Sequence, residues 1–161
     1  MKKSAAPETS DINSAQLMFD VLNEIGIIAQ LSRTLLESRL EDGLTQHHFS
    51  ALNHLVRLGD GRTPLEMARA FQVPKTSMSH TLAGLEKRNL IHMAPNPQDG
   101  RGKLIYLTDA GRLLRDSAID AITPDIMAMI PQFNAGDANA LLPPLRKLRI
   151  LLDSARDQER S

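Results

Sequence analysis

The stretch "TPLEMARAFQVPKTSMSHTLAGLEKR", residues 63–88, decides the fold that this 161-residue chain is expected to adopt. Its first residues predict a helix start, because Thr63 can cap the helix, Pro64 suits the first helical position and Glu66 completes a capping box. The segment "FQVP" at 71–74 then interrupts the helix, since proline cannot continue it. The stretch therefore begins with a short helix and a tight turn.

A second helix follows that turn and carries a regular apolar stripe. Met78, Leu82 and Leu85 recur at helical spacing, which predicts that this side of the helix is buried. Asn89 can end the helix, because asparagine tolerates the left-handed conformation that a helix end requires. Residues 64–88 thus predict a helix-turn-helix.

Two short β-prone runs come next, "LIHMA" at 90–94 and "KLIYL" at 103–107. A polar loop at 95–102, with two prolines and two glycines, lies between them, and the pattern predicts a two-stranded hairpin. The loop contains Asp99 and Arg101. We expect Arg101 at the mobile tip of this hairpin.

Helices are also predicted before this core. Apolar residues at three-to-four spacing run from Leu17 to Leu40 and indicate a long amphipathic helix, which Gly43 is expected to end. Thr45 can cap the next helix. The inner side of that second helix is expected to hold Phe49, Leu52, Leu55 and Val56.

Long helices are predicted after the hairpin as well. Thr108 can cap a helix that Pro124 and Pro131 are expected to kink or end, and a last amphipathic helix is expected at about 138–155, distorted at the prolines 143 and 144. The flanking helices carry more apolar surface than one thin domain can bury. We therefore expect a second copy of the chain to cover that surface.

Composition excludes several classes of function. The chain has no cysteine, which excludes disulfides, thiolate metal sites and thiol-based redox sensing. Its longest apolar stretch, "IGIIAQL" at 25–31, is far shorter than the ~20 residues that span a bilayer. No apolar segment follows the two N-terminal lysines, as a signal peptide would require. We therefore expect a cytoplasmic protein without a membrane partner.

The formal net charge is zero, but the charges are unevenly distributed. Residues 62–115 hold nine Lys and Arg against four Asp and Glu, whereas residues 1–61 and 116–161 are both acidic. A basic centre between acidic flanks concentrates a positive potential on the predicted helix-turn-helix and hairpin. Chance variation on a charged surface is the alternative, and charge alone does not decide between the two.

The exposed residues near the start of the second helix suit contact with DNA. They are Lys75, Thr76, Ser77, Ser79 and His80. Hydroxyl groups can bind base edges, Lys and a protonated His can bind phosphate, and the helix N-terminus adds its own attraction for phosphate. Alternatively, the hydroxyl residues serve only as capping and turn residues.

The hairpin adds a second set of candidates, Asp99, Arg101 and Lys103. An arginine flanked by glycines can enter a minor groove beside the helix, where the negative potential favours a guanidinium. Asp99 can hold that guanidinium by a charge-assisted hydrogen bond. The alternative is a solvated turn with a weak surface ion pair.

The run from 65 to 91, the "DGR" at 99–101 and the "LTDAG" at 107–111 together resemble the winged helix-turn-helix core of the MarR family of bacterial transcriptional regulators. The match spans about residues 44–115, and the flanking helices stand where that family has its dimerisation helices. The resemblance implies a mainly α fold with a small two-stranded β wing. It also implies a homodimer that binds double-stranded DNA through the residues named above, usually as a repressor, and that a small-molecule effector often releases.

The resulting plan of the chain has five parts. We expect a disordered tail at 1–10, an N-terminal dimerisation helix at 11–43, the winged helix-turn-helix DNA-binding domain at 44–108, C-terminal dimerisation helices at 109–156 and a disordered tail at 157–161. The expected function is repression by occupancy of a pseudo-palindromic operator.

Three departures from the family pattern bear on DNA affinity. His80 stands where arginine is common, Gly84 replaces a usual polar or basic residue, and Met93 and Ala94 stand where arginines are frequent. Gly84 also lowers helix stability by roughly 1 kcal/mol relative to alanine. These departures predict modest non-specific affinity and a greater dependence on the wing.

No other functional site is expected. His47, His48 and His54 share one predicted helix, but no carboxylate or cysteine lies beside them at the spacing of a metal site, so we expect surface or interface histidines and no metal or cofactor. No set of nucleophile, base and orienting residue is visible, so an enzyme is not expected. The alternative function is a winged helix that binds another protein without contacting DNA. The lack of basic residues at positions 84, 93 and 94 favours this alternative.

Overall fold

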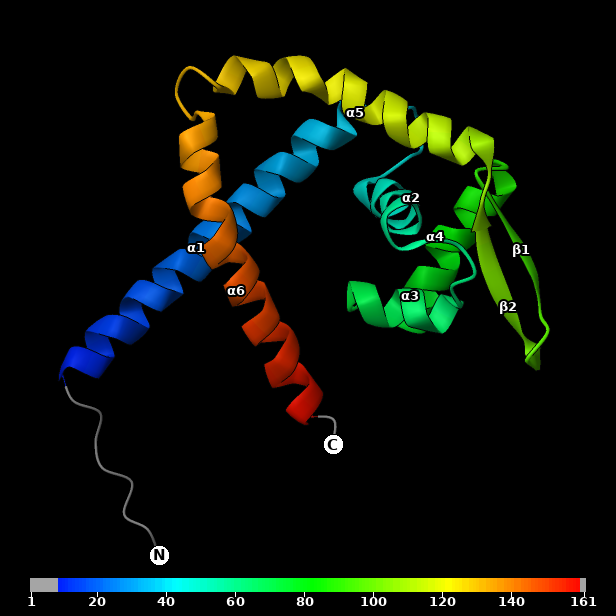
Figure 1. Ribbon diagram of the computed structural model, residues 1–161, viewed down its shortest axis with the longest axis horizontal. Helices are drawn as coiled ribbons and strands as arrows, with labels where there is room; N and C mark the ends of the chain where they lie inside the picture. The colour runs from blue at the N-terminus through cyan, green and yellow to red at the C-terminus, as the bar shows by residue number, and fades with distance from the viewer. Residues whose placement is uncertain (1–8, 160–161) are drawn as a thin grey trace, which may run out of the picture. The chain divides into compact units, whose positions relative to one another are not determined.

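The computed structural model describes residues 9–159, and Figure 1 shows its helices and strands. Residues 1–8 and 160–161, which belong to the predicted tails, lie outside the described part, whereas residues 9–10 and 157–159 are helical. The elements are α1 (Thr9–Glu37), α2 (Gln46–Leu58), α3 (Pro64–Phe71), α4 (Lys75–Lys87), β1 (Ile91–Asn96), β2 (Asp99–Leu107), α5 (Asp109–Met129) and α6 (Ala135–Glu159). The predicted class, mainly α with a two-stranded β wing, is confirmed.

The chain divides into two compact units after Ile119, inside α5. The first unit holds α1 to β2 and the first turns of α5, and the second unit holds the rest of α5 and α6. All candidate DNA-binding residues lie in the first unit. The predicted boundaries between dimerisation and DNA-binding segments remain predictions.

The helix-turn-helix forms as its capping signals predict. The Thr63 backbone N–H donates to Glu66 Oε2 over 2.7 Å, and the Glu66 backbone N–H donates to Thr63 Oγ1 over 3.2 Å, so a capping box opens α3. Pro64 is the first residue of that helix. Gln72 takes a left-handed conformation, with φ of 59°, in the turn before α4, and Asn89 does so after α4, with φ of 58°.

One core lies between α2, α3, α4 and the hairpin. Its most deeply buried side chains are Leu52, Leu55, Met67, Leu82, Leu85, Ile91 and Ile105. The predicted stripe of α4 is buried, and α2 buries Leu52 and Leu55 as predicted, whereas Phe49 and Val56 are only half-buried. Each large apolar side chain that is fully buried contributes about 1.5–3 kcal/mol of transfer free energy, so this core holds α4 firmly.

The hairpin strands pair in antiparallel register, with Ile91 opposite Leu107. On the other edge of β2, Ile105 forms a bridge with Arg62, in which the Ile105 N–H donates to the Arg62 carbonyl oxygen over 2.8 Å. The segment before α3 therefore covers part of the edge of β2. The wing is anchored along its base and extends away from it (Figure 1).

The end of the hairpin differs from the prediction. The predicted loop 95–102 is mostly strand, and only residues 97 and 98 form the turn. The register shifts after the pair of Asn96 and Asp99, so residues 100–102 bulge out of the ladder. Arg101 therefore stands in a β-bulge of β2 and not at the tip. Its two flanking glycines favour a bulge as much as a loop, which is why the sequence pattern did not separate the two.

The connection between α1 and α2 also differs from the prediction. α1 ends at Glu37, so the expectation that it continues to Gly43 is wrong. Gly43 takes a φ of 78° in the connection, where a Cβ would lie 2.6 Å from Nη2 of Arg88. The Gln46 N–H donates to Glu37 Oε1 over 2.8 Å, and Arg33 Nε donates to Gln46 Oε1 over 2.8 Å. These bonds join the end of α1 to the start of α2.

Most apolar side chains of α1 are exposed. Those between 38 and 66% exposed are Ile12, Leu17, Met18, Phe19, Val21, Leu22, Ile27, Ile28 and Leu31. Among the α1 side chains that the structure describes, Leu36 alone is buried. An exposed apolar surface of this length is typical of an association surface.

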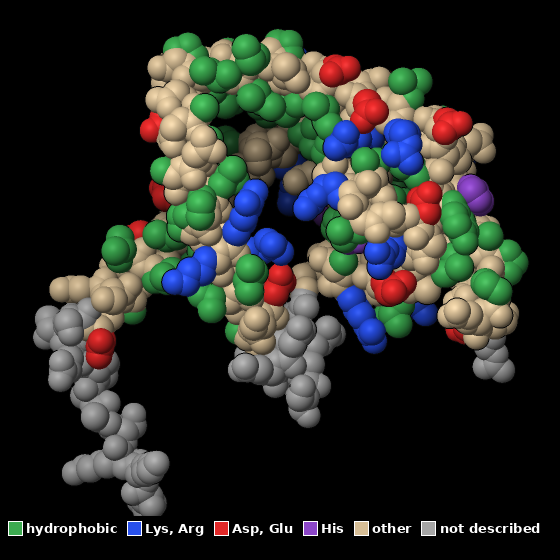
Figure 2. Space-filling view, viewed as in Figure 1, with side chains coloured by type: hydrophobic (Ala, Val, Ile, Leu, Met, Phe, Trp, Pro, Cys, Tyr) green, Lys and Arg blue, Asp and Glu red, His purple; other side chains and the backbone are tan. Residues whose placement is uncertain are grey.

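The second unit, taken by itself, also leaves apolar side chains exposed. They are Ile126, Met127, Met129, Ile130, Phe133, Leu141, Leu142, Ile150, Leu151 and Leu152. Figure 2 shows hydrophobic side chains open at the surface along the C-terminal half of α5, at the top of the view. α5 passes Pro124 and ends before Pro131, and α6 continues through Pro143 and Pro144, so these interior prolines do not end their helices.

Candidate DNA-binding surface

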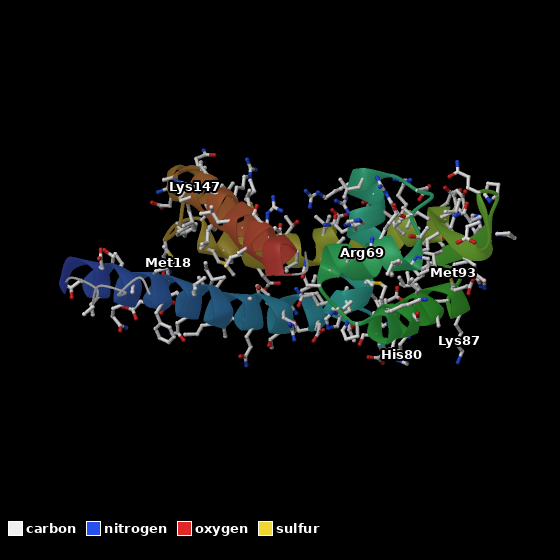
Figure 3. The ribbon with its side chains drawn as sticks, turned by 90° about the horizontal axis from the view of Figure 1, so that it is seen from below. Met18, Arg69, His80, Lys87, Met93 and Lys147 are labelled. Carbon is white, nitrogen blue, oxygen red and sulfur yellow. The ribbon has the colours of Figure 1, made fainter. Side chains whose placement is uncertain are left out.

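The five residues predicted on the second helix lie in the first two turns of α4, and all are exposed. Thr76, His80, Ala83 and Lys87 recur at i, i+4, i+7 and i+11, so they share one side of the helix, which we call the outer stripe. The helical period places this stripe opposite the buried residues of α4. Figure 3 shows His80 and Lys87 pointing outward on the same side.

Lys87 was missed among the candidates from the sequence. It lies two helical turns after His80, and that spacing is the signal that could have identified it. Lys75 and Ser79 flank the outer stripe on one side, and Ser77 flanks it on the other. The helix thus presents hydroxyl groups near its N-terminus and an ammonium group near each end.

Two polar contacts fix the C-terminal end of α4. Glu86 Oε1 accepts the Met93 backbone N–H of β1 over 3.2 Å. Arg88 Nη2 donates to the Asp42 carbonyl oxygen over 2.7 Å. The first contact ties the helix to the wing, and the second ties it to the connection between α1 and α2.

Thr108 joins α5 to the end of α4. Its hydroxyl donates to the Asn89 carbonyl oxygen over 2.8 Å and accepts the Gly111 N–H over 3.0 Å, and its own N–H donates to the Leu90 carbonyl oxygen over 3.2 Å. A Cβ on Gly111 would collide with that Leu90 carbonyl oxygen. The "LTDAG" motif therefore lets the start of α5 lie close to the backbone of Leu90. The hydroxyl at its second position makes the hydrogen bonds, and the glycine at its last position leaves room for the Leu90 carbonyl.

His48 contacts both the start of α2 and the side of α4. Its Nδ1 accepts the Thr45 backbone N–H over 3.1 Å, in the position that Glu or Gln takes in a capping box. Its Nε2 lies 2.7 Å from the point where a Cβ on Gly84 would stand. Burial is the largest of the causes that lower the pKa of His48, and the charge of Arg88 acts in the same direction. The neutral imidazole, which can accept this hydrogen bond, is therefore favoured.

The wing carries the second set of candidates. Asp99 and Lys103 are exposed. Asp99 Oδ2 lies 3.1 Å from the point where a Cβ on Gly102 would stand, so the glycine leaves room for this carboxylate. The side chain of Arg101 lies outside the described part of the structure. The predicted ion pair of Asp99 and Arg101 therefore remains a prediction.

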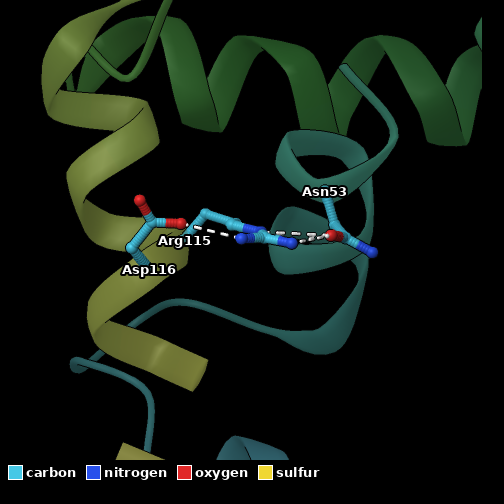
Figure 4. Close-up of polar contacts among 3 residues, drawn as sticks. All are labelled: Asn53, Arg115 and Asp116. Atoms are coloured by element: carbon cyan, nitrogen blue, oxygen red, sulfur yellow. Dashed lines mark hydrogen bonds and ion pairs between the residues drawn. The ribbon is translucent and has the colours of Figure 1, made fainter. Parts of the chain in front are cut away.

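Arg115 connects α5 to α2, as Figure 4 shows. Its Nε and Nη2 donate to Asn53 Oδ1 over 3.1 and 3.0 Å, and its Nη1 donates to Asp116 Oδ1 over 2.8 Å. Arg115 also borders an apolar depression, whose other lining residues are Leu40, Leu44, Phe49, Leu52, Leu114 and Ala118.

The histidines of α2 belong to no cluster of three or more possible metal ligands among the residues that the structure describes. His54 instead packs against the ring of Phe71, with centroids 5.2 Å apart. Burial is the largest cause that lowers the pKa of His54, and the charges of Arg62 and Arg57 act in the same direction.

None of the helices that the structure describes is long and apolar enough to cross a membrane.

Known proteins are similar in sequence to this chain. A sequence model of the MarR family matches residues 42–102, from the connection before α2 to the bulge of the wing. The HTH-type transcriptional repressor NicR from Pseudomonas putida is 25% identical over 153 residues, which cover 92% of this chain and 95% of the repressor.

Solved structures share the fold. BpsR from Bordetella bronchiseptica, whose DNA binding is regulated by 6-hydroxynicotinic acid, superimposes with a TM-score of 0.68 at 21% identity, over 81% of this chain and 98% of that chain. A mutant MarR from E. coli, solved in complex with operator DNA, superimposes with a TM-score of 0.69 at 22% identity, over 81% of this chain and 94% of that chain.

Proposed function

We propose that the chain is a regulator of the MarR family, a homodimeric repressor that occupies a pseudo-palindromic operator and leaves it when a small-molecule effector binds. The family model that matches residues 42–102 and the similarity to a transcriptional repressor support this proposal. The observation that carries the proposal is the outer stripe of α4 with its flanking residues. These side chains are exposed and, apart from Ala83, polar or basic, on a helix whose opposite side is buried in the core.

In this proposal α4 lies in the major groove. Thr76 and Ser79 bind base edges, because hydroxyl groups can donate to or accept from either base of a pair. Lys75 and Lys87 bind phosphates on either side of the groove, and His80 adds a charge to that contact when it is protonated. Phosphate contacts set the register of the helix, and base contacts set its sequence preference.

The wing supplies the contact beside the groove that α4 occupies. We assign Arg101 to the minor groove, where a guanidinium is favoured by the negative potential, and Lys103 to a phosphate. The bulge at 100–102 interrupts the regular ladder of the strand around Arg101. Asp99 lies at the start of the same strand, where its carboxylate can orient the guanidinium.

The exposed apolar side chains support the homodimer. α1 leaves nine large apolar side chains open, and the second unit leaves a further set open on its own surface. A second copy of the chain would cover them through a two-fold axis. Two-fold symmetry would place the two α4 helices ~34–36 Å apart, which requires an operator with half-sites one helical turn apart.

A small aromatic carboxylate is the proposed effector class. BpsR responds to 6-hydroxynicotinic acid, and in this chain Arg115 borders an apolar depression that is closed in this structure, so an effector would have to open it. A carboxylate there would compete with Asn53 and Asp116 for the guanidinium, and so would loosen the link between α5 and α2. The effector can release DNA only if it binds the DNA-free arrangement more tightly than the DNA-bound one.

Selection of genomic DNA fragments by the purified full-length protein tests the function. The enriched fragments should share a pseudo-palindrome with half-sites about one turn, ~10 base pairs, apart. Addition of 6-hydroxynicotinic acid should lower their recovery, and Arg115→Ala should weaken that response. Recovery no better than that of random fragments would contradict the proposal.

The runner-up function, a winged helix that binds a protein partner only, is supported by the absence of basic residues at Met93 and Ala94 in β1. Arg101→Ala separates the two functions. A DNA-binding repressor should lose affinity for the enriched fragments in this variant, whereas a protein-binding module has no such affinity to lose.

A further inference from the structure

We propose that His48 is a positioning residue for DNA recognition, whose imidazole sets how closely α4 packs against the start of α2 and therefore how the outer stripe faces the DNA. This inference rests on the proposed function, since it concerns the same surface. His48 itself lies beside α4 and outside the set of residues assigned to DNA contact.

The imidazole of His48 is fixed at one end. Its Nδ1 lies 3.1 Å from the Thr45 backbone nitrogen, which donates to it, and 2.9 Å from Thr45 Oγ1. The first four N–H groups of a helix have no partner within the helix, so this bond satisfies a group that α2 would otherwise leave open. The ring cannot move away without breaking the bond that opens α2.

The other end of the ring meets α4 at Gly84. The point where a Cβ would stand on Gly84 lies 2.7 Å from Nε2 of His48 and 3.5 Å from its Cδ2. A real Cβ does not come within 3.0 Å of another heavy atom, so no larger residue fits at position 84 while the ring keeps its place. The half-buried Gly84 thus leaves open the space that His48 fills.

A second contact lies one turn further along the same side of α4. Arg88 follows Gly84 by four residues, and its guanidinium donates to the Asp42 carbonyl oxygen over 2.7 Å. The His48 contact comes from the first turn of α2, and the Arg88 contact comes from the connection between α1 and α2, which the Gln46 to Glu37 bond ties to α1. These contacts add to the core in orienting α4, and a shift at Gly84 would turn the neighbouring outer stripe.

The charges around His48 make the contact sensitive to protonation. The positive or titratable groups that face it are Arg88, His47 and His80, and together with burial they oppose a charged imidazole. Protonation would also remove the lone pair on Nδ1 that accepts the Thr45 N–H. The positioning contact thus depends on neutral His48.

A double-mutant cycle on the full-length protein tests the proposal. Wild type, Gly84→Ala, His48→Ala and the double variant would be titrated by fluorescence anisotropy into duplex DNA from the region upstream of the chain's own gene, and into a shuffled duplex. Gly84→Ala should lower the affinity for the upstream duplex roughly tenfold, about the loss of one good base contact. It should change neither the affinity for the shuffled duplex nor the salt dependence. Adding His48→Ala should recover most of that loss, because the new methyl group then has room.

Urea unfolding of the same four proteins without DNA provides an independent measurement. Gly84→Ala should lower the unfolding midpoint when His48 is present and raise it when His48 is absent, since alanine is the better helix former. His48→Gln should retain wild-type DNA affinity, because an amide oxygen can accept the Thr45 N–H.

The outcomes separate this inference from the proposed function. Equal effects of Gly84→Ala in both backgrounds, on affinity and on unfolding, would overturn the role of His48. If wild type binds neither duplex, the repressor function fails and the positioning role with it, while the unfolding cycle still shows whether the His48 to Gly84 contact exists.

Discussion

The region from α2 to β2 and the helix α1 use their apolar residues in opposite ways. In the first region Leu52 and Leu82 are at most 1% exposed, whereas in α1 Leu17 and Phe19 are 66 and 63% exposed. The first region thus completes its own core, and α1 leaves its apolar side chains for another surface. In the proposed function, the first region would bind DNA as a rigid body and α1 would supply the association surface.

Removing a side chain from the core of the α2 to β2 region should have the largest effect on stability. Leu82→Ala should lower the free energy of unfolding by about 2–5 kcal/mol, because it removes buried apolar surface and leaves a cavity below the outer stripe of α4. Urea unfolding followed by circular dichroism would measure the loss. Leu65→Ala on α3, where the side chain is 45% exposed, is the matched control and should change stability by less than about 0.5 kcal/mol.

A pair of glycine substitutions compares α1 with the place where α5 crosses close to the region from α2 to β2. Gly111→Ala should destabilise the protein by about 1–3 kcal/mol, because the new methyl group collides with the Leu90 carbonyl oxygen. Gly26→Ala in α1 has open space around it and should stabilise by about 0.5–1 kcal/mol through helix propensity. Thermal unfolding of both variants gives the signs. Destabilisation by Gly26→Ala would show that α1 is packed closely in solution.

The association role of α1 can be tested separately from folding. Phe19→Ser should raise the dimer dissociation constant roughly tenfold, since burying a Phe side chain is worth about 1.5–3 kcal/mol, and sedimentation velocity would measure the shift. The unfolding of the α2 to β2 region should not change. Leu65→Ser is the control on α3, and equal weakening of the dimer by that variant would place the interface elsewhere.

The smallest expected effect is a pH dependence of stability inside the core region. The pKa of His48 is lowered by burial, then by Arg88, His47 and His80, from its ordinary value of 6.5, so the unfolded chain binds its proton more tightly than the folded chain does. The stability that His48 confers is therefore fully present above about pH 6.5 and is lost as the pH falls from there through the folded-state pKa.

Urea midpoints measured between neutral and mildly acidic pH would show this loss. His48→Gln should reduce the slope, because glutamine keeps the capping bond and does not titrate. His54, whose pKa is also lowered, should leave part of the slope in place, and His54→Gln is the matched variant. An unchanged slope in His48→Gln would show that its neutral form is not favoured by folding.

The sequence predicts the core region well, because each local signal agrees with the packing there. The capping box of Thr63 and Glu66, the stripe of Leu82 and Leu85 and the left-handed Asn89 all depend on contacts within a few residues or on helical periodicity. The resemblance to the MarR family, predicted from the same stretch, is confirmed by the family model that matches residues 42–102.

The predictions from the sequence fail where a residue contacts a partner that is distant in the sequence. Gly43 looks like a helix cap, but its role is to admit the guanidinium of Arg88. Gly84 looks like a weak point of α4, yet it makes room for His48. The glycines around Arg101 mark a bulge whose position depends on the register with β1. Periodicity and local capping do not contain these distances, and only the folded structure supplies them.

The assignment of the outer stripe of α4 to DNA recognition is tested most directly by a binding measurement. Fluorescence anisotropy at several salt concentrations would compare the affinity of the full-length protein for the duplex from its own upstream region with its affinity for a shuffled duplex. Wild type should prefer the upstream duplex, with affinity falling as salt rises. The double variant Thr76→Ala, His80→Ala should lose roughly tenfold or more of that preference. Lys147→Ala, which removes a charge from α6, should behave as wild type. Equal affinity of wild type for both duplexes, or an undiminished preference in the double variant, would contradict the assignment of the outer stripe of α4 to DNA recognition.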